Sequence, residues 1–455
     1  MTARERSLAI DAICAGPAVA PAASSQNMNE THPRIILLMG PATYRAGAFA
    51  AAAERLGLDV IQGIDLPDHL AEHWHVPLAL DFAQPDVAVD HLINYVRDHP
   101  VAAILSVDDS ATLVAAQASA RLGLPHNDPA SALAARDKFV MRTRLAEGGV
   151  PVPDFQPYCL TTDPADIAER INYPCVVKPL RLAGSRGVIR ADDPASFVAA
   201  FTRTRQMLLG DGFIPEETEI LVERYLPGVE VALEGLLTNG DLHVLALFDK
   251  PDPLTGPFFE ETIYVTPSRL PVETQQAIAR RTAEAAAALG LREGSVHAEL
   301  RINDDGVWPI ELAGRSIGGL CSTILEFGAG MTLEEIILRH AVGLPLPSTE
   351  RTGDAAGVIM IPIPKRGMLR AIEGQEDACQ VPGITGLEIT AKLNYPILPL
   401  PEGASYLGFI FARADTPAAT EAALRAAHAK LRIRIDPMLS LSNQRPAISD
   451  QLFPG

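Results

Sequence analysis

The stretch that decides the fold is GSVHAELRINDDGVWPIELAGRSIGGLCST, residues 294–323. Two short runs of alternating apolar residues, Val296–Ile302 and Val307–Leu312, flank a turn-like Asn-Asp-Asp-Gly at residues 303–306. Alternation on both sides of such a turn predicts a β-hairpin, in which every second side chain faces the same side.

Each arm of this hairpin carries one carboxylate among apolar neighbours, Glu299 in the first arm and Glu311 in the second. Acidic side chains are rarely buried without partners. Two carboxylates on paired strands suit a hard cation such as Mg²⁺, which takes oxygen ligands and often bridges substrate phosphates. The alternative is a half-exposed hairpin with two solvated glutamates, and the rest of the chain has to decide between the two.

The composition is that of a globular protein. With 455 residues, 47% of them hydrophobic and 21% charged, the chain can form about two or three domains. Its formal net charge of −18 argues against nucleic acid and anionic membranes as partners, because both require clustered Lys and Arg. No apolar run approaches the roughly 18 residues of a membrane-spanning helix.

Cysteine usage favours a reducing compartment. The five cysteines are odd in number, scattered and without a CxxC pair, so neither a disulfide framework nor a structural zinc site is expected. The cytoplasm is the natural setting. Residues 1–32 lack the continuous apolar core of a secretory signal, and we predict that they form a disordered leader.

Residues 33–130 alternate between short apolar runs and helical patterns. The run Arg34–Met39 is followed by a helical pattern at Arg45–Leu56 and a further strand, which is the spacing of a βαβ unit. We predict a Rossmann-like α/β domain with a parallel sheet. Its first turn, at residues 40–43, is Gly-Pro-Ala-Thr and lacks GxGxxG, so a dinucleotide is not expected.

An aspartate pair and a long helical pattern lie near the end of this domain. Asp108 and Asp109 follow a predicted strand, and we favour a capping role for them at the start of the helix Ser110–Leu122. The next pattern, Ser131–Gly149, predicts one continuous helix that contains Lys138 and ends at a glycine pair.

A central domain is predicted over residues 131–345, with a smaller unit at about 153–225. In that unit an apolar strand ends in Lys178 and runs into the loop Leu182-Ala-Gly-Ser-Arg-Gly-Val188. Glycines allow backbone amides to approach phosphates closely, and the lysine places an ammonium beside them. An ordinary hairpin turn explains the loop equally well. From residue 346 to 455 short strands and turns predict an α+β domain.

The order of these motifs resembles the ATP-grasp superfamily over about residues 33–435. The motifs are the strand ending in Lys178, the glycine loop, Val222-Glu-Arg-Tyr-Leu-Pro-Gly-Val-Glu230, and Glu299…Glu311-x-x-x-Arg315. The segments GMLRAIEG and SYLGFIFARADTP resemble the C-terminal region of ATP-grasp amino-acid ligases and biotin-carboxylase-like proteins. The resemblance implies a Rossmann-like N-terminal domain, an ATP-grasp central domain with a small lid, and an α+β C-terminal domain.

The resemblance also implies a role for each matching residue. The residues it places around the phosphates of ATP are Lys138, Lys178 and, in the lid, Ala183, Gly184, Ser185 and Gly187. The residues it places around adenine and ribose are Glu223, Arg224, Tyr225, Leu226 and Glu230. Glu299 and Glu311 would bind Mg²⁺ or Mn²⁺, and Arg315 would face the reacting carboxyl and phosphoryl groups, for which its planar fork is suited.

ATP-grasp enzymes activate a carboxylate as an acyl phosphate, which a nucleophile then attacks. In the segment Phe248–Ser268, where biotin carboxylases carry basic residues, this chain offers Lys250, but the pair Glu260 and Glu261 dominates. A carboxylate suits the ammonium of an amino acid, so we expect a carboxylate–amine ligase with Glu261 at the substrate amino group. Gly318 and Gly319 would leave room for the substrates. A biotin-carboxylase-like enzyme is the alternative.

Three further points stay open. Gly314-Arg-Ser316-Ile-Gly318 matches the GxSxG nucleophile elbow of serine hydrolases, and a non-catalytic ATP-binding protein is another alternative. The family usually has Glu-x-Asn at the second metal strand, whereas this chain has Ala313, which leaves the number of metal ions open. The partners implied are small-molecule acids and amines, and a homodimer is compatible with the resemblance.

Overall fold

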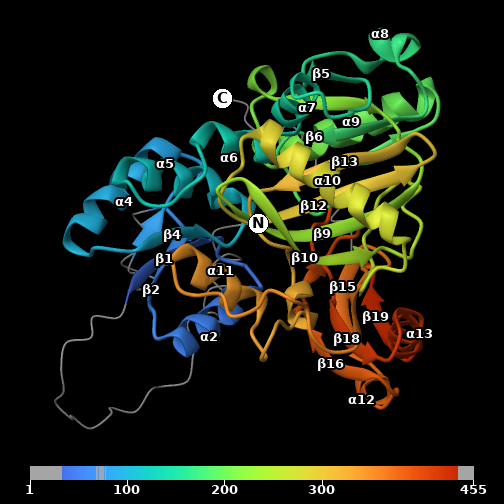
Figure 1. Ribbon diagram of the computed structural model, residues 1–455. Helices are drawn as coiled ribbons and strands as arrows, with labels where there is room; N and C mark the ends of the chain where they lie inside the picture. The colour runs from blue at the N-terminus through green and yellow to red at the C-terminus, as the bar shows by residue number, and fades with distance from the viewer. Residues whose placement is uncertain (1–32, 68–69, 71–75, 77, 439–455) are drawn as a thin grey trace, which may run out of the picture.

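The computed structural model describes residues 33–67, 70, 76 and 78–438, which form four β-sheets (Figure 1). The predicted leader at residues 1–32 lies outside this described part. Among the described residues, no helix has the length and apolar character needed to cross a membrane.

The N-terminal region is a parallel sheet with helices on both faces, as predicted. Its strand order is β3-β2-β1-β4, with bounds Leu78–Leu80, Asp59–Asp65, Arg34–Met39 and Ala103–Ser106. Its helices are α2 (Ala46–Leu56), α4 (Pro85–Asp98) and α5 (Thr112–Leu122). Alternate residues of β1 pack against α2 on one face and against α4 and α5 on the other, so every residue of the strand after Arg34 is apolar.

The centre of the molecule is an eight-stranded sheet in the order β13-β12-β9-β10-β11-β14-β18-β16. The first five strands are β13 (Gly306–Ala313), β12 (Gly294–Asn303), β9 (Val229–Thr238), β10 (Asp241–Asp249) and β11 (Ile263–Thr266). The other three are β14 (Ala355–Ile361), β18 (Gly408–Ala414) and β16 (Ile384–Ile389). Strands β12 and β13 form the hairpin that the sequence predicts.

The two faces of the central sheet differ in chemistry. Val231 and Leu233 of β9 and Val296 of β12 pack with helix α10 (Val272–Leu289) in one apolar cluster. The residues that alternate with them along each strand point to the opposite face. On β9 these include Glu230 and Glu234, so the second face carries charge at its centre.

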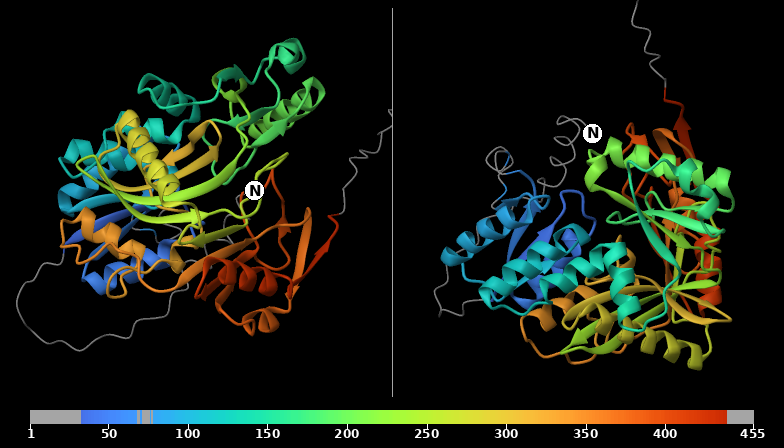
Figure 2. Two further views of the ribbon diagram at one scale, coloured as in Figure 1. Left: turned by 45° about the vertical axis from the view of Figure 1, so that its right-hand side comes forward. Right: turned by 90° about the horizontal axis from the view of Figure 1, so that it is seen from above.

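A small antiparallel sheet forms the lid, in the order β5-β8-β6-β7. Its elements are β5 (Phe155–Cys159), α8 (Pro164–Ile167), β6 (Cys175–Pro179), β7 (Ile189–Ala191), α9 (Pro194–Gly210) and β8 (Glu219–Arg224). In both views of Figure 2 this lid, drawn in green, stands on the opposite side of the molecule from the N-terminal region, drawn in blue.

The C-terminal region contributes strands to the central sheet and adds a small sheet of its own. That sheet has the order β17-β15-β19, with bounds Pro396–Ile397, Gly367–Glu373 and Arg432–Asp436. Its helices are α12 (Gln375–Cys379) and α13 (Pro417–His428). Because β14, β16 and β18 extend the central sheet past residue 345, the region is continuous with it through backbone hydrogen bonds.

The predicted single helix at residues 131–149 is wrong, because two helices, α6 (Pro129–Arg136) and α7 (Lys138–Glu147), replace it. Asp137 between them has an extended backbone (φ −101, ψ 114), and its carboxylate caps α7 by accepting from the amides of Phe139 and Val140. The helical pattern continues across the break, so periodicity alone did not reveal it. The cap places Lys138 in the first turn of α7, where its amide donates to the carbonyl of Leu180 (3.0 Å).

A buried arginine joins the N-terminal region to the segment after β13. Arg45, 2% exposed, donates from its guanidinium to the carbonyls of Val107 (3.1 Å) and Ser316 (3.3 Å). The same guanidinium also donates to the Ser316 hydroxyl (2.5 Å) and lies 5.0 Å from the centre of the Phe49 ring. These bonds fix the carboxyl end of the parallel sheet against the central sheet.

The lid is in contact with a C-terminal loop. The amide of Gly187 donates to the carbonyl of Pro401 (2.9 Å), and Arg186 donates to the carbonyl of Glu402 (2.8 Å). Arg203 of α9 forms a two-pronged ion pair with the Glu402 carboxylate at 2.6 and 3.0 Å. The lid is thus held closed by residues that lie about 200 positions further along the chain.

We expect Glu402→Ala to loosen this contact, because it removes both hydrogen bonds to Arg203. Hydrogen exchange of the amides at residues 184–188 should become about threefold faster, as suits an exposed ion pair of modest strength. The thermal unfolding midpoint should hardly change. The control is Glu376→Ala, an exposed glutamate on α12. Unchanged exchange at 184–188 would show that the ion pair does not hold the lid.

Candidate active site

One cavity of ≈ 490 Å³ lies between the lid, the central sheet, the N-terminal region and the C-terminal loop. It is lined by sixteen of the seventeen residues predicted for the site: Lys138, Lys178, Ala183, Gly184, Ser185, Glu223, Arg224, Tyr225, Leu226, Glu230, Glu261, Glu299, Glu311, Arg315, Gly318 and Gly319. Gly187 is not among the lining residues. Its φ is +74°, and a Cβ there would meet Met207 at 2.4 Å, so it serves the packing of the loop.

The hairpin places its two carboxylates directly opposite each other. Glu299 on β12 is paired in register with Glu311 on β13, so both side chains project from the same face. Like charges on directly opposed residues are unfavourable unless a cation lies between or beside them. Lys138 approaches Glu311 (Nζ to Oε2, 3.5 Å), and Lys250 approaches Glu299 (Nζ to Oε1, 3.4 Å).

The second predicted phosphate lysine is buried in an ion-pair network. Lys178, at the end of β6, contacts the carboxylate of Glu223 on β8, which also accepts from Arg142 of α7 at 2.9 and 3.3 Å. Although burial alone would raise it, the two cations hold the pKa of Glu223 at about 2. Burial lowers the pKa of Lys178, and Glu223 opposes this shift. Both carboxylate oxygens of Glu223 already accept these bonds. Its contact with adenine stays a prediction.

The lid loop has the backbone geometry of a tight cradle. Gly184 and Ser185 have φ values of 63° and 54°, in the left-handed region. Lys138 donates to the carbonyl of Leu182 (2.8 Å), which brings its ammonium beside this loop. The sequence predicted the ammonium of Lys178 beside this loop. The ammonium that bonds to the loop is that of Lys138, from a helix that precedes the lid in sequence, whereas Lys178 bonds to Glu223.

The hinge segment after β8 forms one wall of the cavity. The amides of Arg224 and Tyr225 donate to the carbonyls of Asp154 and Pro174, and the carbonyl of Leu226 accepts from Arg301 (2.7 Å). The Tyr225 ring is covered by Arg190 and Arg301, at 4.2 and 5.3 Å from its centre. The segment is therefore fixed from both sides, although neither cation was singled out in the sequence.

Arg315 is held by the N-terminal region. Its guanidinium donates to the carboxylate of Asp109 (2.5 Å) and to the carbonyl of Ser316 (2.9 Å). Although burial opposes it, the Asp109 charge holds the pKa of Arg315 above its usual value. The predicted capping role of the aspartate pair is wrong. The short 3-10 helix Asp109–Ala111 has no side-chain cap, and Asp108 accepts instead from the Gly40 amide and the Thr43 hydroxyl (both 2.9 Å).

Cross-strand pairs between β9 and β12 supply further charges. Arg301 lies opposite Glu230 and donates to it (2.8 Å), while His297 lies opposite Glu234 (3.1 Å). Glu234 is fully buried and also accepts from the amide of Ile317 at 3.0 and 3.1 Å, which fixes the segment behind Arg315. Despite burial, hydrogen bonds to Glu234 and Glu299 raise the pKa of His297 to about 9.

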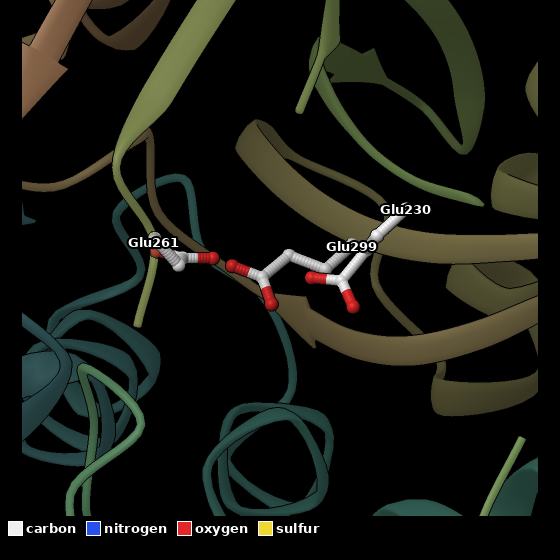
Figure 3. Close-up of side chains that lie close together, drawn as sticks. All are labelled: Glu230, Glu261 and Glu299. Carbon is white, nitrogen blue, oxygen red and sulfur yellow. The ribbon is translucent and has the colours of Figure 1, made fainter. Parts of the chain in front are cut away.

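Three carboxylates converge beside the hairpin, from Glu230, Glu261 and Glu299 (Figure 3). Each offers an oxygen within 4.8 Å of the others. The ammonium of Lys250 contacts all three, and these charges outweigh burial to hold the pKa of Lys250 well above its usual value. Burial and the Glu299 charge raise the pKa of Glu261 to about 7, whereas Lys250 outweighs burial to hold that of Glu299 well below its usual value.

The two glycines after Arg315 differ in their surroundings. A Cβ on Gly318 would have no heavy atom within 4 Å, so this position opens onto free space. Gly319 has φ +60°, and a Cβ there would lie 3.0 Å from the Phe409 ring. The cavity wall near them is apolar and includes Tyr44, Cys321, Met360 and Tyr406.

Several charged residues of the site had no assigned role in the sequence: Arg142, Lys250, His297 and Arg301. Asp109 was expected to cap a helix and not to hold Arg315. Some signals were available. Arg142 follows Lys138 by one helical turn, and His297 and Arg301 flank Glu299 at alternate positions of one strand. The partner of Arg315 lies about 200 residues away, which a local pattern cannot reveal.

Family models match three regions of the chain. They are described as ATP-grasp N-terminal domain (residues 49–126), ATP-grasp domain (residues 171–324) and L-amino acid ligase C-terminal domain 2 (residues 359–436). The chain belongs to the ATP-grasp superfamily. The predicted fold class is thereby confirmed.

Within the superfamily it is an ATP-grasp ligase similar to L-amino acid ligases. The crystal structure of L-amino acid ligase from Bacillus licheniformis matches with a TM-score of 0.76 and 27% identity, over 90% of this chain and 100% of that chain. Alanine–anticapsin ligase of Bacillus subtilis strain 168 is 26% identical over 314 residues, which cover 64% of this chain and 65% of that protein.

The biotin carboxylase domain of 2-oxoglutarate carboxylase from Hydrogenobacter thermophilus, in complex with MgADP and bicarbonate, shares the fold. Its TM-score is 0.62 at 16% identity, over 90% of this chain and 92% of that chain. At this identity the likeness concerns the fold alone.

The Glu223 network predicts how stability depends on pH. The folded pKa of about 2 lies below the ordinary value of 4.5, so its contribution is complete above pH 4.5 and is lost as the pH falls toward 2. Glu223→Gln should lower the free energy of unfolding at pH 7 by on the order of 3 kcal/mol.

Urea unfolding at pH 7 and at steps below pH 4.5 measures this difference, which should shrink as the pH falls through that window. The exposed Glu169→Gln in the same lid is the control and should show little effect at any pH. A Glu223→Gln effect that does not change between pH 7 and pH 3 would contradict the assigned ion pairs.

Proposed function

We propose that the protein is an ATP- and Mg²⁺-dependent carboxylate–amine ligase that joins amino acids or related small molecules through an acyl phosphate. The observation that carries this proposal is the paired register of Glu299 and Glu311 in a cavity that also receives Lys138, Lys178 and Arg315. Two carboxylates facing several cations suit a metal–triphosphate complex, which needs neutralisation and alignment more than covalent catalysis.

The nucleotide would lie between the lid and the central sheet. Lys138 and Lys178 would hold its phosphates, with Ala183, Gly184 and Ser185 covering them. The hinge residues Arg224, Tyr225 and Leu226 would meet the adenine through their backbone, with Glu223 on its amino side and Glu230 at the ribose hydroxyls. Contact between the lid and the C-terminal loop supports the exclusion of water, on which an acyl phosphate depends.

The donor set fits a hard divalent cation. Glu299 and Glu311 present carboxylate oxygens from one face, as Mg²⁺ or Mn²⁺ requires. Such an ion supplies charge neutralisation for the phosphates during transfer. Ala313 offers no ligand atom in its side chain and lies opposite His297, so the two glutamates are the ligands that the hairpin provides.

Arg315 would hold the acid that is activated. A carboxylate oxygen of the acid attacks the γ-phosphorus of ATP, and ADP leaves. The amine nitrogen of the second substrate then attacks the acyl carbon, phosphate leaves and the nitrogen loses a proton. The guanidinium stabilises the charge that gathers on the transferring oxygens, and Asp109 keeps it in place.

Glu261 is our candidate for the substrate amino group. It lies at the cavity beside Glu299, and its carboxylate suits an ammonium ion. A biotin-carboxylase-like reaction would instead call for a cation facing the cavity there. The open space at Gly318 supports room for a substrate side chain in this part of the cavity, whereas Gly319 packs closely against the Phe409 ring.

The serine hydrolase alternative finds no support in the geometry. Ser316 is 2% exposed, and its hydroxyl is bound by the Arg45 guanidinium rather than by a histidine. Two histidines follow it in sequence: His340 bonds to Thr238, and His428 ends helix α13. A nucleophile needs a base within hydrogen-bonding reach.

The ligase proposal predicts that ADP and phosphate are released only when an acid and an amine are supplied together with ATP and Mg²⁺. A matrix of amino-acid pairs, assayed for phosphate and by mass spectrometry, should show a product with the summed mass of the pair minus one water. Reactions lacking either partner are the controls. ATP cleavage that depends on bicarbonate would instead support the carboxylase alternative, and cleavage without any pair would contradict the proposal.

Glu311→Gln and Ser316→Ala separate the metal site from the nucleophile elbow. Loss of one metal carboxylate should reduce kcat by about 100-fold or more. Ser316→Ala should keep kcat within about tenfold, while lowering the thermal midpoint because it removes a bond to Arg45. Full activity in Glu311→Gln together with none in a folded Ser316→Ala would contradict the metal assignment.

A further inference from the structure

The carboxylates of Glu230, Glu261 and Glu299 have the arrangement of a cation site. They come from β9, the segment before β11, and β12, and their oxygens lie within 4.8 Å of one another. Figure 3 shows the Glu261 and Glu299 carboxylates pointing toward each other, with Glu230 beside Glu299. Three carboxyl groups this close need a positive charge among them if they are to ionise together.

Sheet order explains which residue provides that charge. Strand β10 lies between β9 and β11, and its last residue, Asp249, is paired with both of them. The next residue, Lys250, therefore leaves the sheet amid the strands that carry the carboxylates. Its side chain is 3% exposed, and its ammonium lies 2.9 Å from Glu230 Oε1 and 3.4 Å from Glu299 Oε1. It also forms a short contact with Glu261.

We propose that Lys250 is a built-in cation that occupies the place of a divalent ion among Glu230, Glu261 and Glu299. An ammonium has three donors; this one donates to Glu230 and Glu261 and forms an ion pair with Glu299. A divalent ion placed among the same carboxylates would be strongly repelled by this ammonium, because both would be cations at short range in a buried site. The two cations therefore exclude each other from this cluster.

Lys250 also determines which side of Glu299 is open to a metal. Both Lys250 and the imidazole of His297 approach the same oxygen, Glu299 Oε1, at 3.4 and 3.6 Å. Within the described part of the chain, the other oxygen has no ion pair. This second oxygen is therefore the one that would bind the metal together with Glu311. Lys250 is thus a positioning residue, and this second role rests on the proposed function, in which Glu299 holds the metal.

The test is Lys250→Met, assayed by Mn²⁺ titration with electron paramagnetic resonance on the nucleotide-free, full-length protein. Without the ammonium, the three carboxylates should bind one Mn²⁺ more per chain than the wild type does. Added Mn²⁺ should raise the thermal midpoint of the variant by on the order of 3 °C more than that of the wild type. Lys250→Arg keeps the charge and should gain no ion.

The matched control is the exposed Lys365→Met, which should behave as the wild type. If Lys250→Met does not fold without metal, Lys250→Met/Glu261→Gln removes one of the repelling charges. That double variant should fold and should bind fewer ions than Lys250→Met refolded with Mn²⁺. Equal Mn²⁺ stoichiometry and equal thermal shifts in Lys250→Met and wild type would overturn the proposal.

These measurements use neither ATP nor substrates. A negative result would therefore overturn the assignment of Lys250 and leave the ligase proposal intact, and a negative ligase assay would leave the Mn²⁺ result intact. The positioning role has its own readout in the ligase assay. The Mg²⁺ concentration at half-maximal rate should rise at least tenfold in Lys250→Met and stay within about threefold in Lys250→Arg. A change in kcat alone, at an unaltered Mg²⁺ requirement, would contradict that role.

Discussion

The constraint on which the centre of the molecule depends is the neutralisation of carboxylates on one face of the central sheet. Glu230, Glu234 and Glu299 project from that face, whereas their neighbours in sequence pack against α10. A slip of one residue in the β9–β12 register would move these charges into the apolar cluster, at a cost of several kcal/mol for each unpaired charge. The cross-strand partners Arg301 and His297 therefore specify the register as much as the apolar alternation does.

The remaining cations reach the same face from separate parts of the chain. Lys138 comes from α7, Lys178 from the lid and Lys250 from the end of β10, and Arg315 is held in place by Asp109 of the N-terminal region. In a chain with a net charge of −18, the residues that line this cavity thus include as many Arg and Lys as Asp and Glu. Because each cation belongs to a different unit, the electrostatics of the cavity depend on how these units are placed relative to one another.

The hairpin and the order of motifs could be predicted because their signals are local: alternation, a turn of Asn, Asp and Gly, and a strand ending in lysine. The break at Asp137 escaped prediction because the helical pattern runs through it, although a capping aspartate was visible. The Arg315–Asp109 and Arg142–Glu223 pairs depend on how distant segments meet. Lys250 was visible as an isolated basic residue, but its three partners come from strands whose order the sequence does not state.

Position 313 carries alanine where the family usually has asparagine, and the charges around the hairpin are consistent with this difference. Ala313 is buried and lies directly opposite His297, whose imidazole is placed between Glu234 and Glu299. A methyl side chain adds no ligand at the second strand, while the opposite residue adds a positive charge beside Glu299. Two groups of the protein, an imidazole and the Lys250 ammonium, then act on one oxygen of that carboxylate. In the site that we propose, these two groups supply the charge that a second ion would otherwise supply on this side.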